Sequence, residues 1–322
     1  MKPYVAGPPG AVSPVALMND EALLTAVAMR GEGVEKGQAG TTLLATALLF
    51  LALGGLHWGW KMVVYLAVGI ALHELGHVLA MRLFGYKNVR MLFVPLFGGL
   101  ATGVPRELDA TKNALVALAG PVFGLMTAGV AGLAAFMLGS PQWLVQFAWV
   151  SLLLNAFNLI PFVPLDGGQF ANDTLFSRFP ALELVFRLVA IAGLGWIAWI
   201  LQAWLLGGLV GFMLITTPVT YRRARLIREA RRDPTWQNRT LDLATVTRLR
   251  ELVAQVFNTL AREKYEKKLP EHVHGVWLEI HKRFPGPGRT LALLGAYVFT
   301  CAIGIPVVTF FLVSCLERPL FE

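Results

Sequence analysis

Three residues within five positions carry groups that could do metal chemistry. His73 and His77 are four residues apart in the segment ALHELGHVLA, so on a helix their imidazoles project from nearly the same face, one turn apart. Two imidazoles placed in this way suit one zinc ion. Glu74 is rotated by roughly 100° around such a helix, where it could take a proton from a zinc-bound water as general base. The H-E-x-x-H spacing is typical of zinc metalloproteases.

The surroundings of these three residues favour a functional role over a structural one. They lie within an apolar stretch at residues 62–83, and ionisable groups inside such a stretch are costly and by default functional. Histidines can also cap or hydrogen-bond helices in a bundle, but that role does not account for the adjacent glutamate. We therefore interpret His73, Glu74 and His77 as the centre of a metal site.

A hydrolytic zinc site needs a third protein ligand and an open position for water. Asp166 is the best candidate, in the segment NLIPFVPLDGGQ that follows another apolar stretch. Two prolines before it hold the chain extended, and two glycines after it would let the backbone pass close to a metal. Without the histidines, LDGG would be an ordinary turn with a surface aspartate.

Composition places these groups in a membrane. Hydrophobic residues make up 56% of the 322 residues and charged residues only 15%, whereas soluble domains carry about 25% charged residues. Apolar stretches long enough to cross the hydrocarbon predict an all-α polytopic membrane protein with about six to seven transmembrane helices. We place these spans at residues 41–58, 62–83, 113–138, 143–160, 182–200, 201–217 and 290–315.

Residues 89–105, VRMLFVPLFGGLATGVP, interrupt this pattern of spans. They are too few and too rich in glycine and proline for a spanning helix, and their β-branched and aromatic content predicts a hairpin or re-entrant loop. Irregular backbone at membrane depth is tolerated only where protein or a watery cavity covers it. We therefore expect a cavity nearby.

The placement of basic residues indicates the orientation in the membrane. If the spans alternate, most Lys and Arg outside them fall on one side, which the positive-inside rule makes cytoplasmic. We expect a multi-pass protein of the cell inner membrane, with the N-terminus and residues 221–289 in the cytoplasm. We expect four domains. Residues 1–40 form a mobile tail, and residues 41–220 form a transmembrane core that holds the site. Residues 221–289 form a basic helical segment, and residues 290–322 form a last transmembrane helix with a short tail.

The basic segment carries the whole charge excess of the chain. Residues 222–289 hold sixteen Lys or Arg and eight Asp or Glu, and this difference of +8 equals the net charge. Binding of nucleic acid is one interpretation of such a segment. Because the segment lies beside a membrane span, attraction to anionic lipid headgroups is the simpler interpretation. We expect membrane lipids and no nucleic acid as partners. Amphipathic patterns at 241–261 and 271–284 predict a small helical cap, and a further short helix is expected near residues 19–30.

Two motifs together resemble the site-2 protease family of intramembrane zinc metalloproteases. That family pairs an HExxH helix with a later N-x-x-P-x-x-x-L-D-G segment, and both are intact here, at residues 73–77 and 158–167. The resemblance covers about residues 62–168. It implies Zn2+ held by His73, His77 and Asp166, with Glu74 activating water.

The resemblance also indicates where a substrate would bind. Family members carry a glycine-rich loop beside the site, which Phe97, Gly98 and Gly99 resemble, and this loop could pair with an unwound substrate by strand addition. Asn158 could hydrogen-bond the substrate backbone or the developing oxyanion. Equally, Asn158 could only satisfy carbonyls at a broken helix end.

One family motif is incomplete. Gly120 and Pro121 match a G-P-x-x-N pattern, but Gly124 stands at its asparagine position. A glycine cannot supply the polar group that is usual at that position, for example to position substrate. The predicted zinc ligands are not affected by this departure.

The predicted function is therefore hydrolysis of peptide bonds in or near the transmembrane segments of membrane-protein substrates, as in regulated intramembrane proteolysis. A catalytically inactive family member that binds membrane proteins is an alternative, which Gly124 supports. A metal-ion transporter would not need a glutamate right after the first histidine, and transporters often show repeated halves, which we do not find. The LDGG segment disfavours membrane proteases whose third zinc ligand is a glutamate.

Overall fold

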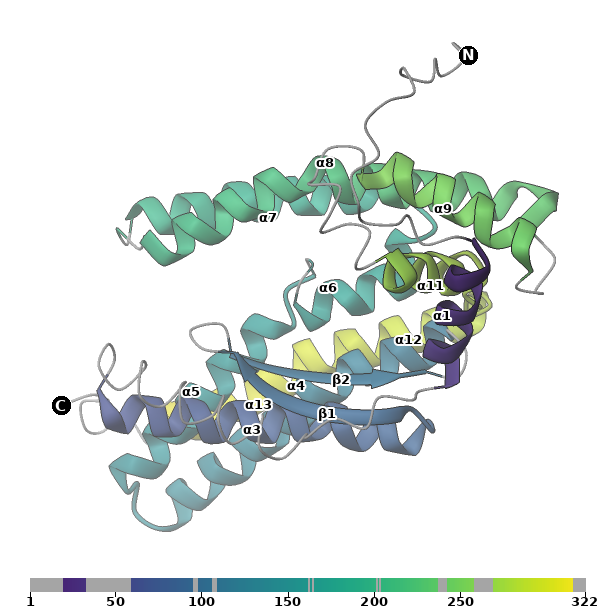
Figure 1. Ribbon diagram of the computed structural model, residues 1–322. Coiled ribbons are helices and arrows are strands. Elements are labelled where there is room, and N and C mark those ends of the chain that lie inside the picture. The colour runs from purple at the N-terminus through teal and green to yellow at the C-terminus, as the bar shows by residue number, and fades with distance from the viewer. Residues whose placement is uncertain are drawn as a thin grey trace.

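The computed structural model describes residues 20–32, 59–94, 98–105, 109–161, 163, 165–200, 202, 204–236, 242–257 and 269–314. The described part is mostly helical, with one small two-stranded sheet (Figure 1). Four of its helices are long and apolar enough to cross a membrane, which agrees with a membrane protein. The span expected at residues 41–58 lies outside the described residues.

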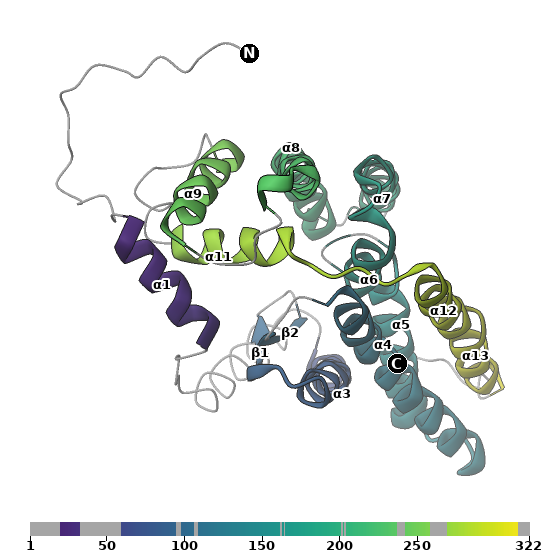
Figure 2. The same ribbon diagram turned by 90° about the vertical axis from the view of Figure 1, so that its right-hand side faces the viewer.

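Three helices form the core that carries the motifs. They are α3 (Trp60–Leu83), α4 (Ala110–Met137) and α5 (Gln142–Asn158), and each packs against the other two. The C-terminal helix, made of α12 (Pro287–Phe299), a π-helical turn η3 (Thr300–Gly304) and α13 (Ile305–Val313), packs on α4 through Val308 and Leu312. Figure 2 shows α4 and α5 between α3 and this last helix.

Small residues bring α3 and α4 unusually close together. A methyl group added at Gly76 would lie 2.5 Å from the carbonyl oxygen of Ala119 and 2.8 Å from Cβ of Phe123. Close approach of this kind is typical of helices packed in membranes, where backbone contact replaces the hydrophobic drive available in water. The helix that carries the histidines is therefore held tightly against α4.

A β-hairpin covers α3, as the residues at 89–105 predict. Strand β1 (Lys87–Val94) pairs antiparallel with β2 (Gly98–Val104), with Met91 opposite Ala101 and Leu92 opposite Leu100. Strand β2 packs on α3. The sheet is the only departure from helix in the described core.

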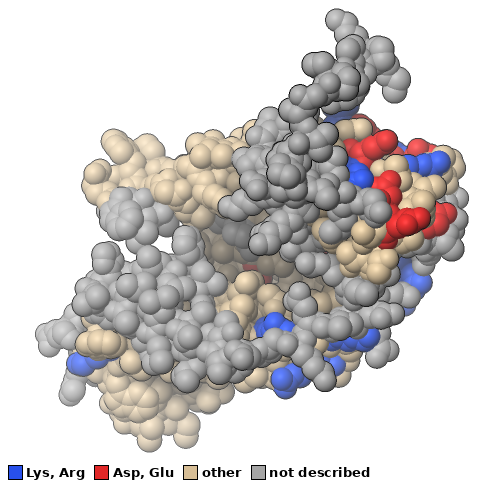
Figure 3. All heavy atoms as spheres, in the orientation of Figure 1, with Lys and Arg blue, Asp and Glu red and all other residues tan. Residues whose placement is uncertain are grey.

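Helices α7 (Pro180–Ile200) and α8 (Trp204–Arg232) form an antiparallel hairpin. The expected break near Gln202 is confirmed, since this residue has a φ of 50° between the two helices. Helix α8 does not end near residue 217 as expected, but continues through Pro218 into the basic sequence. The visible end of this hairpin carries no charge (Figure 3), in agreement with the uncharged sequence from 188 to 221.

A separate helical cluster lies at one end of the molecule. It is built from α1 (Asp20–Glu32), α9 (Leu243–Phe257), α11 (Leu269–Ile280) and the last turns of α8, around buried residues that include Leu23, Val246 and Val273. Asp20 of α1 pairs with Arg250 of α9 at 2.5 Å. The small helical cap is thus confirmed, and it includes a helix from the stretch expected to be a mobile tail. The domain limits stay a prediction, and the limit at 220/221 falls inside α8.

The segment after α11 ties this cluster to the core. Lys282 forms an ion pair with Asp173 in which both side chains are at most 7% exposed. Asp173 lies in a π-helical turn, η1 (Asn172–Phe176), directly after α6 (Asp166–Ala171). The backbone N–H of Ala110, at the start of α4, donates to the carbonyl of Arg283 at 2.9 Å. A short 3-10 turn, η2 (Pro234–Trp236), follows α8.

Removing one partner of this ion pair should destabilise the protein in a pH-dependent way. Burial raises the pKa of Asp173 to about 6, against the opposing effect of the Lys282 ammonium. In Lys282→Met the carboxylate loses the cation that it pairs with, and breaking a buried ion pair costs about 3–5 kcal/mol. Because the Lys282 ammonium lowers the pKa of Asp173, its removal raises this pKa above about 6, and the loss of stability should shrink as the pH falls toward 6 and the carboxyl group takes up a proton.

Thermal unfolding in detergent at pH 5 and pH 7 measures this effect. Arg225→Met is the matched control, because Arg225 pairs with Glu229 at the surface. The control should unfold at the wild-type temperature at both pH values. An equal loss for Lys282→Met at the two pH values would contradict the assignment.

Candidate metal centre

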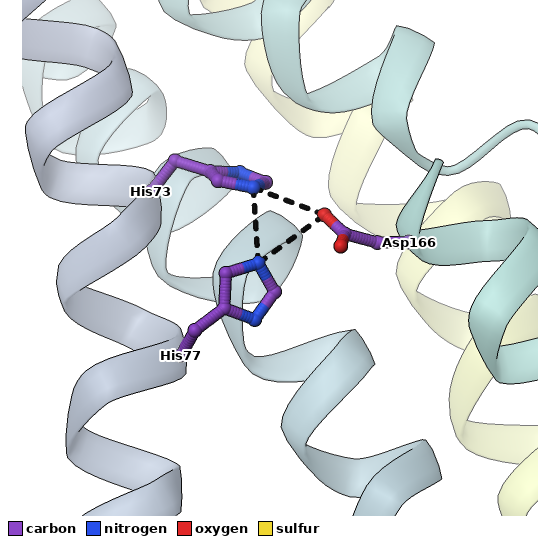
Figure 4. A group of neighbouring side chains, drawn as sticks. All are labelled: His73, His77 and Asp166. Carbon is purple, nitrogen blue, oxygen red and sulfur yellow. Dashed lines mark hydrogen bonds and ion pairs between the residues drawn. The ribbon is translucent and has the colours of Figure 1, made fainter. Parts of the chain in front are cut away.

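Three side chains from two distant segments converge on one point (Figure 4). Nε2 of His73 lies 3.1 Å from Nε2 of His77, and Oδ2 of Asp166 lies 3.0 Å from the first and 3.3 Å from the second. The histidines come from α3 and the aspartate from the first turn of α6. All three residues are at most 9% exposed. The structure thus brings together the residues that the two motifs single out.

Hydrogen bonds on the outer side of each imidazole decide its tautomer. Nδ1 of His73 lies 2.7 Å from Oδ1 of Asn155, and Nδ1 of His77 lies 2.7 Å from the carbonyl oxygen of Val116. Both partners are acceptors, so each Nδ1 carries the proton and donates. Each Nε2 of the neutral imidazole then points an unprotonated lone pair at the carboxylate, which is the arrangement that histidine metal ligands adopt.

These residues fit a zinc ion. Ligands at zinc–nitrogen and zinc–oxygen bond lengths in a tetrahedral site lie roughly 3.3 Å from one another, and the three measured separations are 3.0 to 3.3 Å. Oδ2 of Asp166 is buried without a hydrogen-bond partner among the described residues. Two lone pairs and a carboxylate facing one another repel unless a cation lies between them. A divalent metal satisfies all three at once.

Glu74 lies beside this group, and only one of its two carboxylate oxygens could be assigned a hydrogen-bond partner among the described residues. Its carboxylate is 6% exposed and receives a hydrogen bond from the backbone of Ala101 in β2. Its Oε2 atom has no hydrogen-bond partner in the described part of the chain. A methyl group added at Gly99 would lie 2.6 Å from Oε1, so the strand approaches Glu74 as closely as a glycine permits.

A cavity of about 530 Å³ joins these groups to the hairpin. Its walls include all four residues above together with Gly99 and Asn158. Gly98 is in β2, opposite Val94, and is not part of the described cavity wall. Nδ2 of Asn158 donates to the carbonyl of Leu154 at 3.0 Å, which satisfies a carbonyl near the end of α5 while the residue still borders the cavity. The roles predicted for these side chains stay predictions.

Two polar residues of this region were not among the sequence predictions. Asn155 is fully buried against His73, and Asp173 borders the cavity. Asn155 could have been found, because a polar residue within the apolar stretch at 143–160 needs a partner in the membrane. Asp173 could not, since its sequence surroundings do not differ from those of a surface turn.

Comparison with known proteins bears on the same segment. The family model described as peptidase family M50 matches residues 135–198, which contain Asn158 and Asp166. A protein named "Putative zinc metalloprotease Rip3" from Mycobacterium tuberculosis is 35% identical over 123 residues, covering 36% of this chain and 31% of that protein. These similarities support a place for this chain in the site-2 protease family.

Two further matches come from the archaeon Methanocaldococcus jannaschii. Zinc metalloprotease MJ0392 from Methanocaldococcus jannaschii is 29% identical over 126 residues, which is 37% of this chain and 36% of the relative. The solved structure of a site-2 protease from Methanocaldococcus jannaschii covers 57% of this chain and 92% of its own, at 19% identity and a TM-score of 0.41. The chain spans about a third of the length of the curated relatives it matches.

The contact between Gly120 and His77 offers a test of the metal centre. A methyl group added at Gly120 would lie 2.5 Å from Cε1 and 2.8 Å from Cδ2 of the His77 ring. Gly120→Ala should therefore push the imidazole away from Asp166 and lower zinc affinity by about 10–100-fold, as displaced ligand shells do elsewhere. Competition against a chelator measures this affinity.

Gly129→Ala is the matched control on the same helix. Its added methyl group would meet only Cγ2 of Val308, at 3.5 Å, an ordinary contact. The control should bind zinc like the wild type. Equal zinc affinity in Gly120→Ala and Gly129→Ala would show that zinc binding does not depend on the place of the His77 imidazole against Gly120.

Proposed function

We propose that the protein is an intramembrane zinc metalloprotease, which hydrolyses peptide bonds in or near transmembrane segments of membrane-protein substrates. The convergence of His73, His77 and Asp166 beside an unpartnered oxygen of Glu74 carries this proposal. His73, Glu74 and His77 lie in a helix long and apolar enough to span a membrane, and the group opens onto a cavity large enough for a stretch of substrate backbone. The match to peptidase family M50 and the similarity to a protein named as a putative zinc metalloprotease support the reaction class.

The residues divide the chemical work between metal binding and proton transfer. The two imidazoles and the carboxylate of Asp166 would hold zinc, which would supply Lewis acidity for the attacking water and the scissile carbonyl. Glu74 takes the proton from that water and returns it to the leaving amine. Its Oε2 atom has no hydrogen-bond partner among the described residues and can take this proton, while the backbone of Ala101 donates a hydrogen bond to the carboxylate. Burial excludes bulk water, which strengthens these interactions.

Substrate binds in an extended form along β2. Backbone groups of alternate strand residues point to the same edge, and Ala101 directs its N–H away from β1 toward Glu74. Gly99 and Gly103, two residues to either side, then present their backbone groups along that edge. An unwound segment adding to this edge would lie against Glu74, and Asn158 would bind its carbonyl from the opposite wall.

The orientation proposed for the protein places this cavity nearer the cytoplasm. Helix α3 ends at Leu83, six residues after His77, which is roughly 9 Å along a helix, and the hairpin begins at Lys87. The basic residues of α8 continue from its apolar half and would meet anionic lipid headgroups. The protein would be a multi-pass component of the inner membrane, with water entering from the cytoplasmic side.

Glu74→Gln should abolish proteolysis without removing the metal. A glutamine cannot take the proton, so cleavage should fall by about 10²–10⁴-fold, the usual contribution of a general base, while zinc affinity stays near that of the wild type. Comparison of membrane proteomes from cells with either form reveals the substrates. Glu21→Gln, an exposed change in α1, is the control. Normal cleavage by Glu74→Gln would exclude the mechanism.

The extended mode of substrate binding predicts a cross-linking pattern. Leu100→Cys, with Cys301 and Cys315 replaced by alanine, places a single thiol in β2 at a residue that is 46% exposed. Disulfides to a series of single-cysteine substrates, in the inactive Glu74→Gln background, should form at every second substrate position because strand side chains alternate. A repeat of three to four positions would show that the substrate enters as a helix.

A further inference from the structure

We propose that Asn155 is a positioning residue for the metal ligand His73, and that Gly124 is the gap that admits its side chain. This inference rests on the proposed function, since it concerns the same metal centre. It accounts for the one departure of the chain from the family pattern G-P-x-x-N.

Asn155 uses both ends of its amide inside the membrane-spanning core. Its Nδ2 donates to the carbonyl oxygen of Ser151 at 2.7 Å, and its Oδ1 accepts from Nδ1 of His73 at 2.7 Å. The side chain is completely buried. Because a carbonyl can only accept, the NH2 end must face Ser151, and the oxygen must face the imidazole. The amide therefore cannot turn over without losing its hydrogen bond to Ser151 and bringing its oxygen against that carbonyl.

This fixed amide determines which nitrogen of His73 carries its proton. An oxygen acceptor at Nδ1 holds the proton there, so that Nε2 presents its lone pair to Asp166 at 3.0 Å. It also fixes the rotation of the ring, because the imidazole must keep Nδ1 on the line to Asn155. Partners of this kind on the outer side of a histidine ligand typically contribute 10–100-fold to metal affinity.

Gly124 is in contact with the same amide from the neighbouring helix. A Cβ atom at this position would overlap the Oδ1, Nδ2 and Cγ atoms of Asn155. Ser151 also donates from its hydroxyl to the carbonyl of Gly124, at 3.3 Å. Any side chain at residue 124 would thus enter the space that the Asn155 amide occupies. A chain can supply an amide at this point from α4 or from α5, but not from both.

The side chain of Asn155 thus occupies the place of the asparagine that is missing from the family motif at residue 124. In a chain with asparagine at residue 124, its side chain would begin where the Asn155 amide lies in this protein. Gly124 therefore gives no support to a non-catalytic member of the family. The polar group is present, and it comes from the following helix.

Zinc affinity of the purified full-length protein in detergent tests the proposal, measured by competition against a chelator. Asn155→Leu keeps the size of the side chain but removes the acceptor, and it should bind zinc about 10–100-fold more weakly. Asn155→Asp keeps the acceptor and should stay within about threefold of the wild type, since carboxylates serve at this place in other metal sites. Gln146→Leu, a buried change on the same helix, is the matched control and should bind normally.

Two further variants test the role of Gly124. Gly124→Ala adds only a methyl group, yet it should weaken zinc binding, because the amide must move away from His73. Gly124→Asn combined with Asn155→Gly moves the amide to α4 and should bind zinc more tightly than Asn155→Gly alone. If Asn155→Leu does not fold, Gly124→Ala tests the same contact.

The outcomes separate this inference from the proposed function. A wild-type protein that binds no zinc would overturn both. A wild type that binds zinc, with Asn155→Leu and Gly124→Ala unchanged, would overturn only the role of Asn155. Equal losses in Asn155→Leu and Asn155→Asp would show that an acceptor oxygen at residue 155 is not sufficient to hold His73, and would overturn the role of Asn155 as its acceptor.

Discussion

Two imidazole lone pairs and a carboxylate oxygen point at one another inside an apolar helix bundle, within 3.3 Å. Such an arrangement is unfavourable in an apolar environment unless a cation compensates it. Nearly every other feature of the core serves to hold these three atoms where they are. The outer hydrogen bonds of both imidazoles leave Nε2 unprotonated, and the first turn of α6 delivers Asp166 to them.

Close packing between the helices makes this convergence possible. Glycines stand wherever a neighbouring element approaches the site: Gly76 and Gly120 between α3 and α4, Gly99 against Glu74, and Gly124 against the amide of Asn155. In each case a single added carbon would meet a backbone, a ring, a carboxylate or an amide. The small residues of this core thus act as spacers for the chemistry, beyond their part in helix packing.

Local patterns were enough to predict much of this arrangement. The spacing of His73 and His77 defined one face of a helix, and the LDGG segment identified Asp166 ninety residues later, because both signals are short and contiguous. The hairpin followed from glycine and proline in an otherwise apolar stretch. These features depend on the backbone alone, and local sequence constrains the backbone strongly.

Features that depend on tertiary contacts could not be predicted from local sequence in the same way. Asn155 can be singled out as a polar residue in an apolar stretch, but the sequence does not show that its partner is His73, because that contact forms only when α5 packs beside α3. The sixth span was expected to end at residue 217, but Arg, Ala, Leu and Glu in the basic sequence that follows are good helix formers, and α8 continues through it. Helix α1 is ordered by burying Leu23 and Val27 against α9 and α11, a contact across more than two hundred residues.

Zinc K-edge X-ray absorption of the purified, zinc-loaded protein tests the central claim most directly. The account predicts a four-coordinate ion with only nitrogen and oxygen ligands at about 2.0–2.2 Å, with multiple-scattering features of two imidazoles. The His73→Ala variant should lose one of these imidazoles. A sulfur ligand, a six-coordinate ion, or an unchanged spectrum in that variant would contradict a centre built from His73, His77 and Asp166.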